Sequence, residues 1–163
     1  MSDYIWGKIK LKEKMIFNNY QRNNILVYFT DKKNSLFQCD LEENEIYFNI
    51  ACGYNQMVDL SICEEQYLNC EVSYFFLNAP KKTNNLNLYF ESLYSRIINL
   101  QDVINEIYNN ENVEKITYFH ADEDDVDEYK LVDWKLEAFA DKFFIATILN
   151  MGFTPTIKVV FKK

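Results

Sequence analysis

Short segments in which apolar residues alternate with polar ones, or cluster in runs of β-formers, occupy the first half of the chain. Ile9 and Leu11 alternate with lysines, which is the period of a strand with one buried face. Val, Ile, Tyr and Phe then cluster in compact runs between polar turns, a pattern typical of strands. These runs predict strands at residues 24–30, 36–41, 45–52 and 71–77, with weaker ones around 57–62 and 86–90. The polar residues 42–44 predict a hairpin between the second and third of these runs.

The pattern changes to a helical period after Ser92. Five apolar residues follow one another at spacings of four, three, four and three, which places them on one face of a helix: Leu93, Ile97, Leu100, Ile104 and Ile107. We expect this helix over about residues 93–109, with a later start at Asn99 as the alternative. The polar run 109–112 ends it.

The C-terminal third predicts a strand at 113–119, a second helix over about 131–151 and a closing strand at 156–161. Gly152 and Pro155 mark the end of that helix, because glycine favours the left-handed stop and proline cannot continue a helix. Together these patterns predict a single α+β domain over residues 1–163. Its mainly antiparallel sheet would carry the two helices on one face.

Composition excludes several classes of protein. With 17% aromatic residues the chain has ample core material, and its length suits one domain. Its four cysteines form no CxxC pair and its one histidine completes no zinc set, so we expect no metal and no cofactor. The N-terminus has no apolar core of signal-peptide length, and no stretch is long enough to span a membrane. We therefore expect a soluble, cytoplasmic protein.

Negative charge is concentrated in residues 122–141. This window holds nine of the 25 acidic residues and two of the 17 basic ones, a net charge of −7, so the remainder is close to neutral. A local field of this kind can select a basic partner. On the predicted helix Asp133, Glu137 and Asp141 would form one acidic row beside Trp134. The expected partner-binding residues are Asp122, Glu123, Asp124, Asp125, Asp127, Glu128, Tyr129, Asp133, Trp134, Glu137 and Asp141.

Two other interpretations of the acidic segment stay open. The first is a solvated loop with no partner, because acids near a helix start are also favoured by the helix dipole. The second is a loose cation site. An EF-hand is excluded, because the segment lacks the turn glycine and places Val126 at the fifth ligand position.

Motifs for catalysis or for nucleotide binding are absent from the sequence. No glycine-rich phosphate loop is present, and an isoelectric point of 4.7 disfavours nucleic acid. His120 follows a predicted strand and precedes the acids, so a general base at a strand end is one hypothesis and a loop histidine is the simpler one. We expect no catalytic residue.

The sequence thus favours an acidic module that neutralises a basic protein. A bacterial immunity protein or antitoxin that blocks a cationic toxin, such as a nuclease, would fit this profile. The alternatives are a small enzyme that uses His120 with nearby carboxylates, and a structural or assembly subunit whose aromatic strands form an oligomer interface. The oligomeric state is open.

Overall fold

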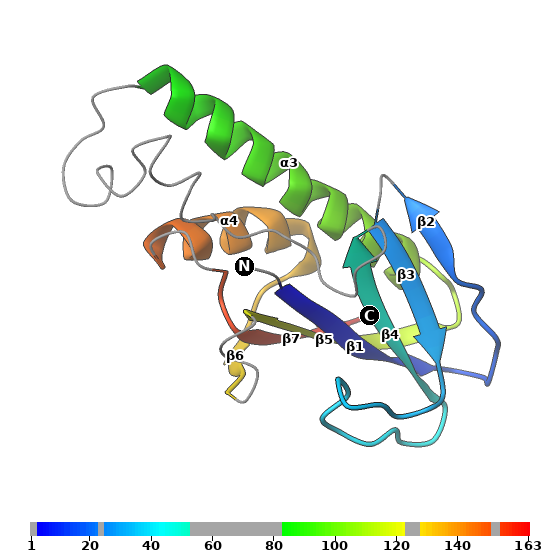
Figure 1. Ribbon diagram of the computed structural model, residues 1–163. Helices are drawn as coiled ribbons and strands as arrows, with labels where there is room; N and C mark the ends of the chain where they lie inside the picture. Colours follow the sequence, from blue (N-terminus) through cyan, green and yellow to red (C-terminus); the bar gives the residue numbers. More distant parts are fainter. Residues whose placement is uncertain (1–2, 23–24, 53–82, 123–127, 151–153) are drawn as a thin grey trace.

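The computed structural model describes residues 3–22, 25–52, 83–122, 128–150 and 154–163 (Figure 1). Within these ranges the chain forms one seven-stranded sheet in the order β2-β3-β4-β1-β5-β7-β6. The strands are β1 Asp3–Leu11, β2 Tyr20–Arg22, β3 Ile25–Thr30, β4 Glu45–Cys52, β5 Val113–Asp122, β6 Lys130–Val132 and β7 Ile157–Lys162.

Neighbouring strands run antiparallel except at one edge. There the short strand β6 lies parallel to β7 and pairs with Ile157–Val159 only. β1 lies in the middle, between β4 and β5, and its pairing with β5 shifts register between Lys10 and Leu11. Gly7 of β1 faces the ring of Phe48 from β4, so the absence of a side chain there leaves room for an aromatic one.

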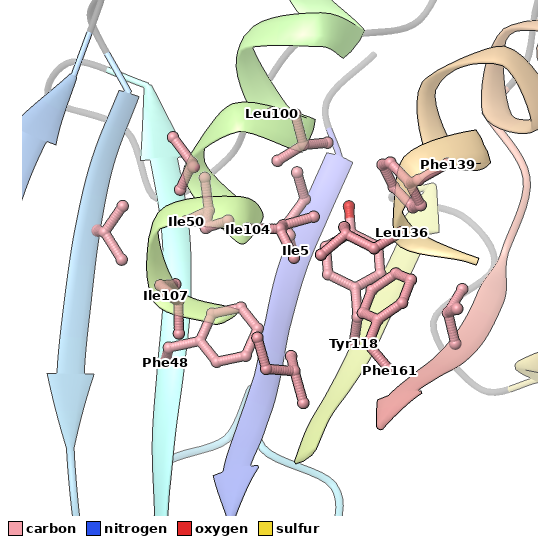
Figure 2. Packing of buried hydrophobic residues seen from close by; sticks show 14 of the residues in the cluster. Ile5, Phe48, Ile50, Leu100, Ile104, Ile107, Tyr118, Leu136, Phe139 and Phe161 are labelled. Carbon is pink, nitrogen blue, oxygen red and sulfur yellow. The ribbon is translucent and has the colours of Figure 1, made fainter. Parts of the chain in front are cut away.

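Two helices cover one face of the sheet: α3 (Thr83–Tyr108) and α4 (Phe139–Leu149), the latter preceded by the 3-10 turn Leu136–Ala138 (Figure 1). Leu100, Ile104 and Ile107 of α3 point toward Ile5 and Ile50 of the sheet (Figure 2). The core under both helices is mainly apolar, as the alternation of each strand requires, with His120 as a buried polar exception. The predicted α+β class and the arrangement of the helices are confirmed.

The opposite face of the sheet carries a smaller aromatic cluster. The loop between β3 and β4, drawn in cyan in Figure 1, crosses below the sheet and inserts Phe37 against Trp6 and Tyr47. Trp6 also stacks on Phe119 of β5, with ring centroids 4.0 Å apart. The sheet is therefore buried on its helix side and partly covered on the other.

Most of the predicted elements are confirmed, including the strands at 24–30, 45–52, 113–119 and 156–161. The five apolar residues of the predicted stripe on α3 are all buried. The strands expected around 57–62 and at 71–77 lie outside the described residues.

Two expectations in the first half are wrong. Residues 36–41 form an irregular loop that packs on the sheet instead of a strand, so β4 pairs with β3 and β1 and not with this segment. Residues 86–90 belong to α3, which begins at Thr83, and Asn99 lies inside that helix. In the sequence Leu86 and Phe90 precede Leu93 at spacings of four and three, so they continue the helical stripe. The same residues also fit the alternating pattern at 86–90 from which a strand was expected.

The second helix is shorter than predicted. Residues 130–132 form β6, because the open edge of β7 and the residue before it offer backbone partners. The carbonyl of Thr156, just before β7, accepts a hydrogen bond from the amide of Lys130 at 3.1 Å. The α-helix begins only at Phe139. Its buried side consists of Phe139, Ala140, Phe143 and Thr147, whereas Ile145 and Leu149 are exposed.

The N-terminus of α4 is capped by the other helix. Ala138, at the cap position, offers no side-chain acceptor. The side-chain oxygen of Gln101 in α3 accepts a hydrogen bond from the amide of Ala140 at 2.7 Å instead.

None of the described helices has the length and hydropathy of a membrane span.

Candidate functional site

The acidic segment connects β5 to β6. Asp122 is the last residue of β5 and pairs with Asp3 of β1. Glu123, Asp124, Asp125 and Asp127 lie outside the described residues, and the chain resumes at the exposed Glu128. One end of the segment thus belongs to β5, inside the sheet, and the other end leads into β6 at the edge of the sheet.

A groove lies at this edge of the sheet. Since β6 pairs only as far as Val159, the groove runs beside the remaining residues of β7. It has a volume of about 820 Å³, and its other walls are the segment from Leu131 to Glu137 and the ring of Tyr108 at the end of α3. Three of the predicted binding residues line it: Asp133, Trp134 and Glu137.

Apolar contact area in the groove comes from Leu131 and Trp134. Leu131 is 68% exposed, which is unusual for a leucine in a strand. Trp134 is half-buried and packs edge-on against Phe139 of α4, with ring centroids 6.2 Å apart. The indole is therefore held by the core while part of it remains accessible, as expected of an aromatic anchor.

The charges along the groove nearly balance. Asp133 and Glu137 are both exposed, and Lys135 and Lys162 line the same hollow. The ion pairs found among the described residues involve neither Asp133 nor Glu137. These two carboxylates are available to a partner, but the strong negative charge of the region comes from the segment Asp122–Glu128.

Asp141 does not join the groove. It lies in the first turn of α4, where it accepts a hydrogen bond from the hydroxyl of Tyr94 in α3 at 2.6 Å. This bond raises the pKa of the Tyr94 phenol, because only the protonated phenol can donate the hydrogen bond to the carboxylate. Asp141 therefore links the two helices.

Tyr129 lies on the other face of the sheet. Its hydroxyl accepts a hydrogen bond from the indole nitrogen of Trp6 at 3.1 Å, and its ring packs edge-on against Phe119. Trp134 packs with the helix-side core, so the two predicted aromatic anchors are attached to opposite sides.

The expected acidic row is wrong as a helical feature. Asp133 lies outside any helix, Glu137 is in the 3-10 turn and Asp141 is in α4. The three residues do not share the i, i+4, i+8 geometry of one α-helix. Sequence periodicity missed four groove residues, because tertiary contacts bring them together: Leu131, Lys135, Tyr108 and Lys162. These contacts are the β6–β7 pairing and the hydrogen bond that the hydroxyl of Tyr108 donates to the carbonyl of Lys162 at 2.7 Å.

His120 occupies a buried position in β5. It has no exposed surface and packs against Phe143 of α4, with ring centroids 4.7 Å apart. Its Nδ1 and the hydroxyl of Tyr118 are 2.7 Å apart, within hydrogen-bonding distance. An imidazole enclosed in this way cannot contact a substrate unless α4 moves, so nothing in its position favours the enzyme hypothesis.

Metal-ligand geometry is not found in the described part of the chain: no three His, Cys, Asp or Glu side chains converge there. Cys39 is a free thiol in the loop between β3 and β4.

A scan against protein-family models finds no match for this chain. Searches of curated proteins and of solved structures give no match either.

Proposed function

We propose that this protein is a binding module for a basic segment of another protein. The observation that supports the proposal is the groove beside β7, which Leu131 and Trp134 line together with the carboxylates of Asp133 and Glu137. An extended peptide can lie along a sheet edge of this kind, with apolar side chains in the hollow.

The acidic segment determines which partners bind in this groove. Asp122–Glu128 holds six carboxylates and no base, and it leads from the end of β5 into the edge strand β6. A concentrated negative field steers cationic partners and raises the association rate. In this proposal the groove provides contact area and the segment provides the charge selectivity.

Toxin neutralisation is the more specific form of the proposal. A cationic enzyme such as a nuclease binds its anionic substrate through basic residues, and an acidic module that covers them would inhibit it. A bacterial immunity protein or antitoxin acts in this manner. We expect such a partner's activity to fall on addition of this protein, and to recover when the groove carboxylates are neutralised.

Site-specific photo-cross-linking tests the binding function. A photo-reactive amino acid at Leu131 should capture a partner in extracts of the producing cells, and the same amino acid at Ile16, which is 88% exposed, should not. Capture at residue 131 should fall as NaCl rises from about 0.05 to 0.5 M, because salt screens surface charge.

Charge variants make the test specific. Asp133→Asn with Glu137→Gln, or Asp124→Asn with Asp125→Asn, should lower capture at residue 131 at least about tenfold. The control Asp31→Asn with Glu43→Gln removes the same charge from exposed positions between β3 and β4. Equal capture by the groove variants and the control would reject the proposal.

A further inference from the structure

A second feature, separate from the groove and its acidic neighbours, lies on the sheet face opposite the helices. Here β1, β5 and β7 lie side by side, and their register places lysines in adjacent rows. Lys10, Lys115 and Lys162 are direct cross-strand neighbours in one row. Lys158 lies two rows further, next to Phe119, with its ammonium 5.5 Å from the ring centroid.

Like charges in one cross-strand row oppose folding. Side chains directly opposite each other on one face of a sheet are close neighbours, and equal charges there are destabilising. The chain as a whole has an excess of eight negative charges, so a lysine row is not a consequence of a generally basic composition. Glu45 of β4 lies opposite Lys10 at one end of this row and offsets part of the repulsion. An anion bound at Lys115 and Lys162 would offset the rest.

The lysines differ in how the protein itself engages them. Lys8 forms an ion pair with Glu45 at 3.0 Å, and Lys10 donates a hydrogen bond to the carbonyl of Glu43. Lys8 also donates a hydrogen bond to the carbonyl of Asp40 at 3.2 Å, so both lysines are bound at the start of β4 and in the loop before it. No carboxylate of the described ranges forms an ion pair with Lys115, Lys158 or Lys162.

The surface is hollowed at these lysines. The loop between β3 and β4 forms one wall through Gln38 and Glu42, and the strands form the floor of a hollow of about 490 Å³. Lys115, Lys158 and Lys162 line it together with Thr117, which is 6% exposed. The ion pair of Lys8 with Glu45 lines it as well, so the lysines outnumber the carboxylates of Glu42 and Glu45 by four to two. This volume suits a small molecule.

We infer that this hollow binds a small anion that carries several negative charges, through the ammonium groups of Lys115, Lys158 and Lys162. Lysine ammonium groups bind phosphate and carboxylate oxygens as flexible point charges. Thr117 contributes a hydroxyl that can donate to the same oxygens. Phosphates and polycarboxylates share this chemistry, and the size of the hollow limits the ligand to a small molecule.

Calorimetric titration tests the inference with two probes, pyrophosphate and citrate, on the full chain in low salt. The test variant is Lys115→Gln with Lys158→Gln, which leaves out Lys162 because that residue also lines the groove. The control, Lys12→Gln with Lys32→Gln, removes the same charge from two exposed lysines. We expect the wild type and the control to bind at least one probe, and the test variant to bind it at least about tenfold more weakly.

Thermal melting provides a second measurement. Without added anion the test variant should melt close to the wild-type temperature. The repulsion between Lys115 and its two neighbours is relieved, and this offsets the lost attractions of Lys115 to Glu45 and of Lys158 to the Phe119 ring. The anion should raise the melting temperature of the wild type and leave that of the variant unchanged.

Pyrophosphate alone as ligand would identify a phosphate site, and citrate alone a carboxylate site. Failure of both probes to bind, or equal binding by the test variant and the wild type, would overturn the inference. Capture of a partner at Leu131 does not depend on Lys115 or Lys158, so the two proposals fail separately.

Discussion

Trp6, Gly7 and Lys8 are consecutive in β1, and each meets a different physical requirement. Trp6 is fully buried in the aromatic cluster, where its indole nitrogen has an acceptor in Tyr129. Gly7 points to the opposite face and makes room for Phe48. Lys8 returns to the face of Trp6 and pairs with Glu45. Period-two alternation decides the side of the sheet, and the neighbouring strands decide what each side chain meets.

Gly7→Ala should destabilise the protein. A Cβ atom at this position would lie 2.2 Å from the carbonyl oxygen of Thr117 and 2.5 Å from the Phe48 ring. We expect the free energy of unfolding, measured in urea, to fall by at least about 2 kcal/mol. Adding Phe48→Leu should restore only part of this loss, since the contact with the backbone oxygen remains. An unchanged urea midpoint for Gly7→Ala would contradict this account.

Glu45 should make stability depend on pH in the acid range. Burial alone would raise the pKa of this carboxyl, but the amide of Glu42 and the ammonium of Lys8 together hold it below its ordinary value of 4.5. A depressed pKa means that the folded state favours the charged form. The stabilisation is therefore present above pH 4.5 and is lost as the pH falls through the folded-state pKa.

Glu45→Gln measures this contribution. At pH 7 the variant should unfold with a free energy about 1–3 kcal/mol lower than the wild type, and the difference should shrink at pH 3. The exposed control Asp31→Asn should change the free energy of unfolding by less than about 0.5 kcal/mol at both pH values. A wild-type advantage over Glu45→Gln that is as large at pH 3 as at pH 7 would argue against the ion pair.

Within the elements, local pattern and tertiary contact compete, and β6 shows which of them prevails. Residues 130–138 carry the apolar spacing of a helix start, yet Lys130–Val132 pairs with β7. Val132 suits either structure, and the unsatisfied backbone groups at the edge of β7 favour the strand. α4 consequently starts at Phe139, where no residue of its own caps it.

Gln101→Leu should therefore destabilise α4 from a distance of 39 residues along the chain. The change removes the acceptor of the Ala140 amide, and we expect a loss of about 1 kcal/mol in the free energy of unfolding. Gln101→Glu keeps an acceptor and adds a favourable charge at the helix N-terminus, so it should be close to neutral or stabilising. Equal losses for the two variants would indicate a packing role instead of capping.

On the scale of the whole molecule, the sheet separates two kinds of charged surface. The acidic segment leads into the start of the edge strand β6, and the lysine rows occupy the face opposite the helices. Since the chain is acidic overall, the lysine hollow is a basic site on a protein with a net negative charge. The two proposed sites therefore attract ligands of opposite charge, and Lys162, which lines both hollows, lies at their boundary.

The sequence alone determined the α+β class, the buried stripe of α3 and most of the strands, because burial imposes periods of 3.6 and 2 that are visible in one dimension. It also determined where the negative charge is concentrated. The groove and the lysine hollow were decided only by the tertiary structure. Lys115 and Lys162 are neighbours because of the register between β5 and β7. Leu131 lines the groove because residues 130–132 pair with β7 instead of extending the helix. Such pairings depend on which distant backbone satisfies which hydrogen bond, and no local period records that choice.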